Sequence, residues 1–284
     1  MSAAVVTLLT HGRPHETDGA LRELAAIATA RGATIRLDAE ESAKHVGLAG
    51  VAGLELEAPL AADAELCVAL GGDGTILRGL RAYARTGVPV FAVNFGEVGF
   101  LSTVEPERMR EGFERALSGT LDVLSLPALE LDGPVGPHVA LNDVSIHRKV
   151  GGRLAEVSYA VGGEEVGSVR CDGLVVATPA GSTGYNLANG GPVLAWGVAG
   201  TVVSFIAPHS LSARALVIAP DDELALHNRS REALSVSVDG RPVGEIAPQE
   251  ALCARFAVDV AMLAQMEGSS FYLRLREKFG RLSR

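Results

Sequence analysis

The sequence has few cysteines and no long apolar run. Its three cysteines, Cys67, Cys171 and Cys253, stand far apart and form no C-x-x-C pair. This spacing excludes a zinc knuckle, and the odd number argues against a disulfide-bonded secreted scaffold. No run approaches the roughly 18 apolar residues that a membrane-spanning helix needs, and the first residues lack the basic segment of a signal peptide. We therefore expect a cytoplasmic protein that has no membrane partner.

The sequence also has fewer positively charged than negatively charged residues. The chain has 25 lysines and arginines against 34 aspartates and glutamates, which gives a formal net charge of −9 at pH 7. Only Lys44, Lys149 and Lys278 are lysines, and we attribute this scarcity mainly to the base composition of the source genome. The negative charge argues against binding nucleic acid through bulk electrostatics. A small phosphate ligand needs only a local positive pocket, so that class of ligand stays open.

Length and hydrophobic pattern favour two folded domains. The 284 residues exceed a typical domain of about 150, and 48% hydrophobic against 21% charged residues argues against disorder. Residues 1–118 alternate strand-like apolar runs with helical periodicity, which predicts a Rossmann-like α/β domain with a parallel sheet. Residues 119–264 hold short β-rich segments separated by turn residues, which predicts an all-β, sandwich-like domain. Residues 265–284 would form a helix that packs back on the first domain, or an edge strand.

The sharpest motif is the turn Gly71-Gly72-Asp73-Gly74-Thr75. It follows the predicted strand 64–70 and opens a predicted helix over 76–86. Ligands of parallel α/β sheets bind at the carboxyl ends of strands, where helix N-termini offer free N–H groups. Three glycines let a phosphate chain approach the backbone. The turn is not a Walker A loop, because no Gly-Lys-Ser/Thr follows, and it lacks the third glycine of the dinucleotide fingerprint.

Asp73 is the unusual member of this turn, because a carboxylate repels phosphate. It could hold Mg²⁺, orient an attacking hydroxyl group, or do both. The structural alternative is that Asp73 caps the helix or shapes the turn, as aspartate commonly does.

Two further clusters follow in the β-rich half. Asn142-Asp143 pairs an amide with a carboxylate, which suits ribose or base hydroxyls, although for this pair taken alone an ordinary Asx turn is the favoured explanation. The segment from Arg170 to Pro192 runs from a buried strand into a loop rich in glycine and small hydroxyl residues. Such a loop can wrap a nucleotide through backbone amides without lysine, and we favour that over an ordinary surface turn.

In order and spacing, these motifs resemble those of the NAD kinase family. Five segments carry the resemblance over roughly residues 65 to 245: Gly71-Gly-Asp-Gly-Thr75, Asn94-x-Gly96-x-Val-Gly99-Phe-Leu101, Leu141-Asn-Asp143, Asp172-Gly through Thr178-Pro-x-Gly-Ser-Thr-x-Tyr185 to Gly190-Gly-Pro192, and Pro208-His-x-Leu-x-x-Arg214. The Gly-Gly-Asp-Gly-Thr turn alone is weak, since lipid kinases share it, but five ordered motifs are specific.

The resemblance implies an enzyme that transfers a phosphoryl group from ATP, or from polyphosphate, to the 2′-hydroxyl of the adenosine ribose of NAD⁺. Mg²⁺ or another divalent ion would assist. Asp73 would be the catalytic residue that orients the hydroxyl and accepts its proton. The active site would lie between the two domains, and the chain would form a homo-oligomer, a dimer or a tetramer.

The resemblance also implies which residues bind the substrates. Gly71, Gly72, Gly74 and Thr75 would form the phosphate-donor loop. The residues that would bind NAD⁺ are Asp73, Gly74, Asn142, Asp143, Arg153, Arg170, Asp172, Thr183, Gly184, Tyr185, Asn186, Leu187 and Ala188. For Arg153 and Arg170, a solvated surface charge is the alternative. No metal ligands are assigned.

Two other functions fit parts of the sequence. A lipid kinase of the diacylglycerol or sphingosine type shares the glycine-aspartate turn and the two-domain plan, but the Asp172 to Tyr185 segment and the lack of a membrane-facing segment speak against it. A catalytically silent sensor of NAD(H) would keep residues 142–188 but would not need Asp73. The sequence does not decide between ATP and polyphosphate, or between NAD⁺ and NADH.

Overall fold

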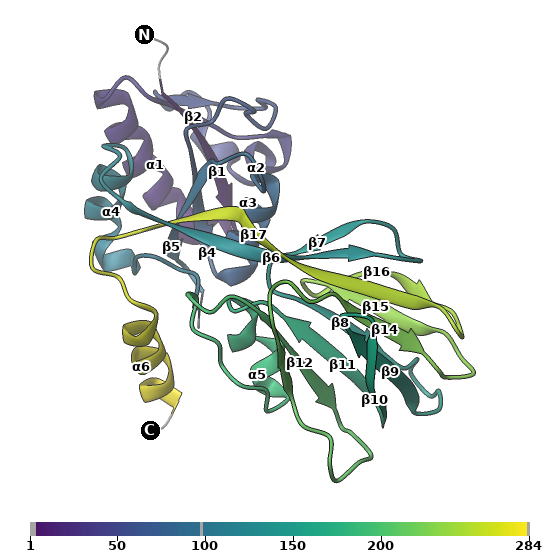
Figure 1. The fold of residues 1–284 in the computed structure, drawn as a ribbon. Helices are drawn as coiled ribbons and strands as arrows, with labels where there is room; N and C mark the ends of the chain where they lie inside the picture. Colours follow the sequence, from purple (N-terminus) through teal and green to yellow (C-terminus); the bar gives the residue numbers. More distant parts are fainter. Residues whose placement is uncertain (1–3, 97–98, 283–284) are drawn as a thin grey trace. The chain divides into compact units, whose positions relative to one another are not determined.

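The computed structural model describes residues 4–96 and 99–282, and the chain divides into two compact units. Unit 1 comprises Met1–Ser125 and Ala261–Arg284, and unit 2 comprises Leu126–Val260 (Figure 1). The boundaries expected from the sequence were residues 118 and 264, where the structure has 125 and 260. Within the described residues, no helix is long and apolar enough to cross a membrane.

Unit 1 is built on a parallel sheet. Its strand order is β17-β5-β4-β1-β2-β3, in which only the last residues of β17 take part. Every residue of β1 and β4 is buried, as expected for strands that are covered on both faces. The strands are β1 (Val5–Thr10), β2 (Thr34–Arg36), β3 (Leu54–Glu55), β4 (Leu66–Gly71), β5 (Pro89–Asn94) and β17 (Ala251–Gln265).

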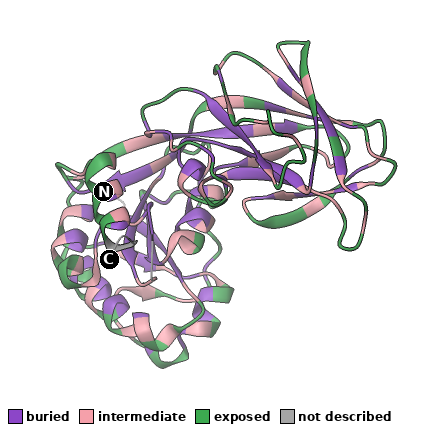
Figure 2. Cartoon of the chain, turned by 90° about the horizontal axis from the view of Figure 1, so that it is seen from below, coloured by how far each residue is buried: buried purple, intermediate pink, exposed green. Residues whose placement is uncertain are grey.

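Helices surround this sheet and complete its core, in which Leu24, Phe91 and Phe113 are fully buried. Figure 2 shows that buried residues concentrate in the strands, whereas the helices alternate buried and exposed residues. The helical segments are α1 (Pro14–Ala30), α2 (Ala39–Lys44), η1 (Val46–Leu48), α3 (Asp73–Ala82), η2 (Pro106–Arg108), α4 (Met109–Ala116) and α6 (Phe271–Leu282).

Unit 2 consists of antiparallel strands in two layers. One sheet has the order β13-β12-β11-β8-β15-β16, and the other contains β10-β9-β14 and the first part of β17, with β6 and β7 paired beside it. The strands are β6 (Asp122–Asp132), β7 (His138–Ala140), β8 (Asp143–His147), β9 (Ala155–Val161), β10 (Glu164–Cys171), β11 (Gly173–Ala177), β12 (Thr201–Ile206), β13 (Leu216–Ile218), β14 (Leu224–Asn228), β15 (Leu234–Val238) and β16 (Arg241–Ile246).

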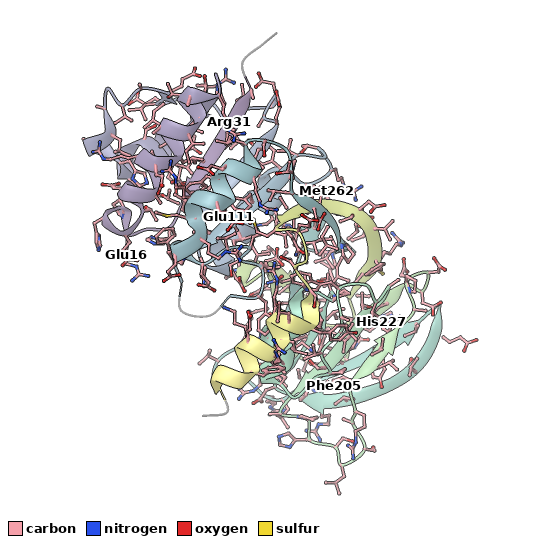
Figure 3. The ribbon with its side chains drawn as sticks, turned by 90° about the vertical axis from the view of Figure 1, so that its left-hand side faces the viewer. Glu16, Arg31, Glu111, Phe205, His227 and Met262 are labelled. Atoms are coloured by element: carbon pink, nitrogen blue, oxygen red, sulfur yellow. The ribbon has the colours of Figure 1, made fainter. Side chains whose placement is uncertain are left out.

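Both sheets of unit 2 contribute to one hydrophobic core. Val144 and Leu174 from the first sheet pack in the same cluster as Val157 from the second. The rings of Phe205 on β12 and Tyr159 on β9 also meet between the sheets, with centroids 5.7 Å apart; Phe205 is labelled in Figure 3. This is the packing of a β-sandwich.

The predicted fold class is confirmed, with an α/β unit followed by a β-sandwich. The final segment forms helix α6, so the alternative of an edge strand is wrong. Helix α3 begins at Asp73, three residues before the predicted start, and ends at Ala82. The earlier start places Asp73 in the first turn of the helix, directly behind its N-cap residue Gly72.

Candidate active site

At two positions, the turn between β4 and α3 is packed too closely for any residue other than glycine. A Cβ atom on Gly71 would collide with the hydroxyl of Thr75, and one on Gly96 would lie 2.9 Å from the Cα of Gly72. Gly74 differs, because a Cβ there would meet nothing within 4 Å. The first turn of α3 therefore has one glycine that packing does not require, and Gly74 is exposed.

Both oxygens of the Asp73 carboxylate accept backbone hydrogen bonds. The N–H of Phe100 donates to Oδ2 at 3.0 Å, and the N–H of Leu101 donates to Oδ1 at 3.1 Å. Gly99 lies against the same group, since a Cβ there would be 2.8 Å from Oδ1. The pKa of Asp73 is raised mainly by burial, and these N–H groups and the charges of Lys278 and Arg274 counteract the rise.

The segment that holds Asp73 belongs to the predicted motif from Asn94 to Leu101. Asn94 is buried; its Oδ1 accepts the N–H of Gly96 at 3.1 Å, and its Nδ2 donates to Glu105 at 3.0 Å. Residues 97 and 98 of the motif lie outside the described residues. The described part of the motif thus contacts the turn at two places: Gly96 lies against Gly72, and residues 99–101 lie against the Asp73 carboxylate.

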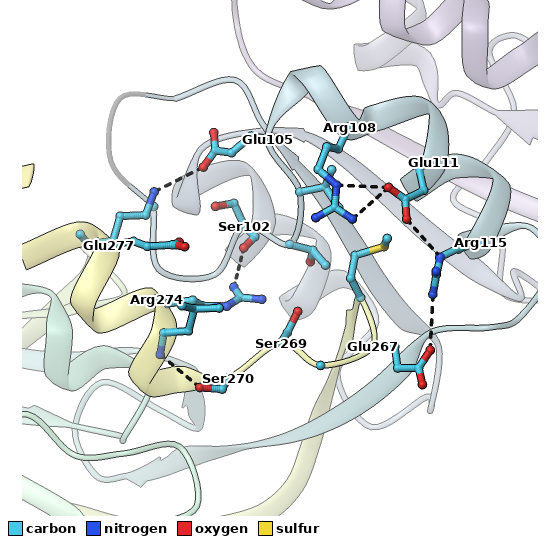
Figure 4. Close-up of a pocket in the computed structure, with 17 residues that line it drawn as sticks. Ser102, Glu105, Arg108, Glu111, Arg115, Glu267, Ser269, Ser270, Arg274 and Glu277 are labelled. Atoms are coloured by element: carbon cyan, nitrogen blue, oxygen red, sulfur yellow. Dashed lines mark hydrogen bonds and ion pairs between the residues drawn. The ribbon is translucent and has the colours of Figure 1, made fainter. Parts of the chain in front are cut away.

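Helix α6 contributes two buried cations to this region (Figure 4). Arg274 donates from Nη1 to the carbonyl of Phe100 at 2.9 Å and also to the carbonyl of Ser102. Burial lowers its pKa to about 10. Lys278 lies with Nζ 3.6 Å from Oε1 of Glu105. Both side chains line a cavity of about 420 Å³ in unit 1.

In unit 2, the turn at Asn142 and Asp143 is held by a third aspartate. The carboxylate of Asp239 accepts the N–H groups of Leu141, Asn142 and Asp143 at 3.2, 2.7 and 3.2 Å. From the other side, the hydroxyl of Thr178 donates to the carbonyl of Leu141 at 2.7 Å. The positions of Asn142 and Asp143 are therefore fixed without the use of their own side-chain polar groups.

Those side-chain groups take no part in holding the turn. Asn142 Oδ1 is buried and finds no hydrogen-bond partner among the residues that the structure describes. Asp143 is only 8% exposed, and burial together with the nearby charge of Asp239 raises its pKa to about 7. An uncompensated buried acceptor is costly, so a donor from a ligand would stabilise Asn142.

The glycine-rich loop after β11 folds into two short helical turns, η3 (Gly181–Thr183) and α5 (Tyr185–Ala188). Asn186 is fully buried, and its Nδ2 donates to the carbonyls of Ser182 and Pro192, both at 2.9 Å. A side chain on Gly181 would collide with Asn142. Asn186 therefore braces the loop, which packs directly against the turn at Asn142.

The exposed side of this loop carries the remaining predicted residues. The ring of Tyr185 stacks on that of His147, with centroids 5.7 Å apart, and burial, with the charge of Asp143, raises the pKa of Tyr185. The hydroxyl of Thr183 donates to the carbonyl of Ala180 at 3.1 Å. Leu187 is partly buried, whereas Gly184 and Ala188 are exposed.

Unit 2 also contains a cavity, of about 260 Å³, and this cavity is rich in arginine. It brings together the predicted residues Arg153 and Arg170 with Arg148, whose Nε donates to Oδ1 of Asp172 at 2.5 Å. Arg153 and Arg170 are exposed. The predicted residues of unit 2 thus form two groups, one around Asn142 and Tyr185 and one around Asp172.

Sequence reasoning missed three residues that shape these sites. Asp239 holds the turn at Asn142, Arg148 pairs with Asp172, and Arg274 holds the segment beside Asp73. The only signal for Asp239 was its place in a Val-Asp-Gly turn between two strands. No three carboxylate, histidine or cysteine side chains come together as metal ligands within residues 4–96 and 99–282.

Two family models match the chain. The model of the ATP-NAD kinase N-terminal domain matches residues 35–121, and the model of the ATP-NAD kinase C-terminal domain matches residues 141–258. Among curated proteins, the NAD kinase of Gemmatimonas aurantiaca is 37% identical over 75% of this chain and 76% of its own length. The NAD kinase of Koribacter versatilis is 36% identical over 84% of this chain and 85% of its own length.

Solved structures agree with these matches. The crystal structure of yeast NADH kinase complexed with NADH has a TM-score of 0.89 at 21% identity and covers 100% of this chain and 89% of the yeast chain, which shows a common fold. The NAD kinase from Archaeoglobus fulgidus, in complex with ATP, has a TM-score of 0.72 at 25% identity and covers 99% of this chain and 98% of that chain. Together with the two family models and the curated relatives, these likenesses show that the chain belongs to the NAD kinase family.

Proposed function

We propose that this protein transfers the γ-phosphoryl group of ATP to the 2′-hydroxyl of the adenosine ribose of NAD⁺, which yields NADP⁺ and ADP. The observation that carries the proposal is the setting of Asp73. Its carboxylate lies in the first turn of α3, on a glycine turn at the carboxyl end of a parallel strand, and both of its oxygens are held by backbone N–H groups.

Asp73 is proposed to orient the attacking hydroxyl and to accept its proton. Each carboxylate oxygen has a second lone pair beyond the one that receives the backbone N–H, so it can accept the 2′-hydroxyl. The raised pKa makes Asp73 a better base than an ordinary carboxylate, which near its reference value of about 4 is weak toward an alcohol. In the loose transition state of phosphoryl transfer, positioning contributes more than proton abstraction.

The donor phosphates are proposed to bind at the glycine turn. Gly72, the N-cap residue of α3, provides no side-chain cap, so the first N–H groups of the helix lack that partner. Gly74 leaves open space beside them, and helix N-termini favour anions. A divalent ion would arrive with the nucleotide phosphates, as is common for Mg²⁺.

The NAD⁺ substrate is proposed to contact unit 2 at both groups of residues. Asn142 and Asp143 would bind the adenosine part, where the buried Asn142 Oδ1 supplies an unused acceptor. The loop from Thr183 to Ala188 would cover the substrate, and Asp172 would hold its nicotinamide side. Arg153 and Arg170 would lie near its phosphates, within the arginine-rich cavity.

One assay tests this function. The protein is incubated with NAD⁺ and Mg-ATP, and NADP⁺ is measured with an NADP⁺-specific dehydrogenase; parallel reactions contain polyphosphate in place of ATP, or NADH in place of NAD⁺. NADP⁺ formation is expected, and the parallel reactions identify the preferred donor and redox form. Well-folded protein that makes no NADP(H) in any reaction, but phosphorylates diacylglycerol or sphingosine, would contradict the proposal.

The assembly and the location of the protein are further parts of the proposal. We propose a homo-oligomer, a dimer or a tetramer, that acts in the cytoplasm. Light scattering coupled to gel filtration measures the mass directly. A monomer that is fully active at assay concentration would contradict the oligomer.

A further inference from the structure

Helix α6 lies outside both matched family regions, which end at residues 121 and 258, yet it carries a buried arginine. Arg274 is only 8% exposed, and Lys278, one turn later, is 6% exposed. The neighbouring Arg276 is exposed. A buried guanidinium is costly unless hydrogen bonds compensate it, so the partners of Arg274 indicate what the helix does.

Two of those partners are carbonyl groups of the segment that holds Asp73. Arg274 donates to the carbonyls of Phe100 and Ser102. The N–H groups of Phe100 and Leu101, in the same segment, donate to the two oxygens of Asp73. Three consecutive residues, Phe100, Leu101 and Ser102, therefore connect the guanidinium of Arg274 with the carboxylate of Asp73. Figure 4 shows the contact of Arg274 with Ser102.

We propose that Arg274 is a positioning residue for Asp73 and that it acts by fixing the backbone of residues 100–102. Its catalytic consequence rests on the proposed function, whereas the anchoring itself does not. The fork of a guanidinium can reach two carbonyls at once, which the single ammonium of a lysine does less well. Without Arg274, both carbonyls would lose a charge-assisted partner, and the N–H groups beside them would no longer be held toward Asp73.

Lys278 provides an internal comparison on the same helix face. Its Nζ donates no hydrogen bond within the part of the chain that the structure describes, and its nearest acid is Glu105 at 3.6 Å. Like Arg274, it places a positive charge near Asp73. Loss of Lys278 would thus remove a charge without releasing residues 100–102, whereas loss of Arg274 would do both.

The experiment compares wild type with Arg274→Gln, Arg274→Lys and the matched control Arg276→Gln, which removes the same charge from the exposed face. Two quantities are measured for each protein: kcat and KM for NADP⁺ formation, and hydrogen–deuterium exchange of the peptides that contain residues 99–104. Exchange of peptides from β1 serves as the reference for general destabilisation. If Arg274→Gln does not fold, Arg274→Lys carries the comparison.

We expect Arg274→Gln to lower kcat by about 10- to 100-fold, as a displacement of about 1 Å does, with little change in the KM for NAD⁺. Exchange at residues 99–104 should rise while β1 stays protected; Arg274→Lys should fall in between, and Arg276→Gln should match wild type. Unchanged exchange, or faster exchange with unchanged kcat, would overturn the proposal. If wild type makes no NADP⁺, the proposed function fails, and the exchange data still decide whether Arg274 anchors the segment.

Discussion

Asp143 is buried and Asp73 is partly buried, and their partners differ. Asp73 has two backbone N–H donors and two nearby cations, which oppose the effect of burial on its pKa. Asp143 faces the carboxylate of Asp239, and its pKa rises to about 7. The backbone N–H donors favour the ionised form of Asp73, which suits the part of a proton acceptor. With a pKa of about 7, Asp143 can also donate a hydrogen bond near neutral pH.

We predict that Asp73→Asn retains NAD⁺ binding and loses most turnover. The amide keeps the size of the carboxylate but cannot take the proton, and its NH₂ group would face one of the two backbone N–H donors. Loss of a general base typically costs about 10²- to 10⁴-fold in rate. Calorimetry measures the affinity, and NADP⁺ formation measures turnover, with the exposed Asp221→Asn as control. Turnover within threefold of wild type would remove Asp73 from the mechanism.

We predict that Asp143 makes stability fall as the pH rises from about 4 to about 7. The folded-state pKa of about 7 lies above the ordinary value of 3.8, so the folded protein binds this proton more tightly than the unfolded chain does. The stabilisation is complete below pH 3.8 and is lost as the pH rises through 7. The side chain of the Asp143→Asn protein does not titrate, so its free energy of unfolding does not fall in this way. For wild type, the fall amounts to at most about 4 kcal/mol.

Urea unfolding at several pH values between 4 and 8 checks this prediction. The free energy of unfolding of Asp143→Asn, minus that of wild type, should increase with pH across the window. The same difference for Asp221→Asn should stay flat. Parallel curves for Asp143→Asn and wild type would show that Asp143 has an ordinary pKa.

At the scale of elements, the turn between β4 and α3 was predicted from the sequence only in part. The strand, the glycine turn and the helix were predicted, because apolar runs and glycines are local signals. The helix start was not, since two glycines weaken helix propensity and suggested a later start. The structure includes Asp73 and Gly74 in the helix, with the acidic side chain at its positive end.

The residues that support the site were harder to predict. Arg274 and Phe100 are 174 positions apart in the chain, and Asp239 and Asn142 are 97 apart. Helix α6 was ambiguous for a similar reason, because its buried face carries Arg274 and Lys278 rather than an uninterrupted apolar stripe. Such contacts depend on the tertiary fold, and no local pattern in a single sequence reports them.

Gly74 and Gly96 should respond oppositely to alanine. The methyl group of Gly74→Ala has room and raises helix propensity, so we predict an unchanged or higher Tm. The same methyl group enters the proposed donor site, so we predict a KM for ATP raised about tenfold, which corresponds to 1.4 kcal/mol. Gly96→Ala forces a Cβ to 2.9 Å from the backbone of Gly72, which should cost about 1–3 kcal/mol of stability.

Thermal unfolding and initial rates at varied ATP concentration separate the two effects. A Gly74→Ala protein with a wild-type KM for ATP would exclude this part of the turn from donor binding. A Gly96→Ala protein as stable as wild type would show that the backbone contact with Gly72 relaxes easily.

Over the whole molecule, the net charge of −9 disfavours the binding of an anionic substrate. One cavity of unit 2 has the opposite local charge. The cavity is lined by five arginines and Lys149, and the acids among its lining residues are Glu156 and Glu232; the arginines are Arg148, Arg153, Arg170, Arg229 and Arg231. Arg148, Lys149 and Arg229 also pair with Asp172, Glu245 and Glu165, so the prediction rests mainly on Arg153, Arg170 and Arg231. The two influences predict opposite effects of salt. Screening of the overall negative charge would help an anion to bind, and screening of local arginines would weaken it.

We predict that the local arginines dominate, so that the KM for NAD⁺ of wild type rises with salt concentration. The double variant Arg153→Gln, Arg170→Gln should raise the KM at low salt and flatten its salt dependence, because exposed guanidiniums act mainly through screened charge. Arg31→Gln, an exposed arginine at the end of α1, is the control and should keep the wild-type slope. Initial rates from low to moderate KCl give the slopes. If the KM of wild type falls as salt is added, the net charge of the protein governs binding, and the proposed role of Arg153 and Arg170 is wrong.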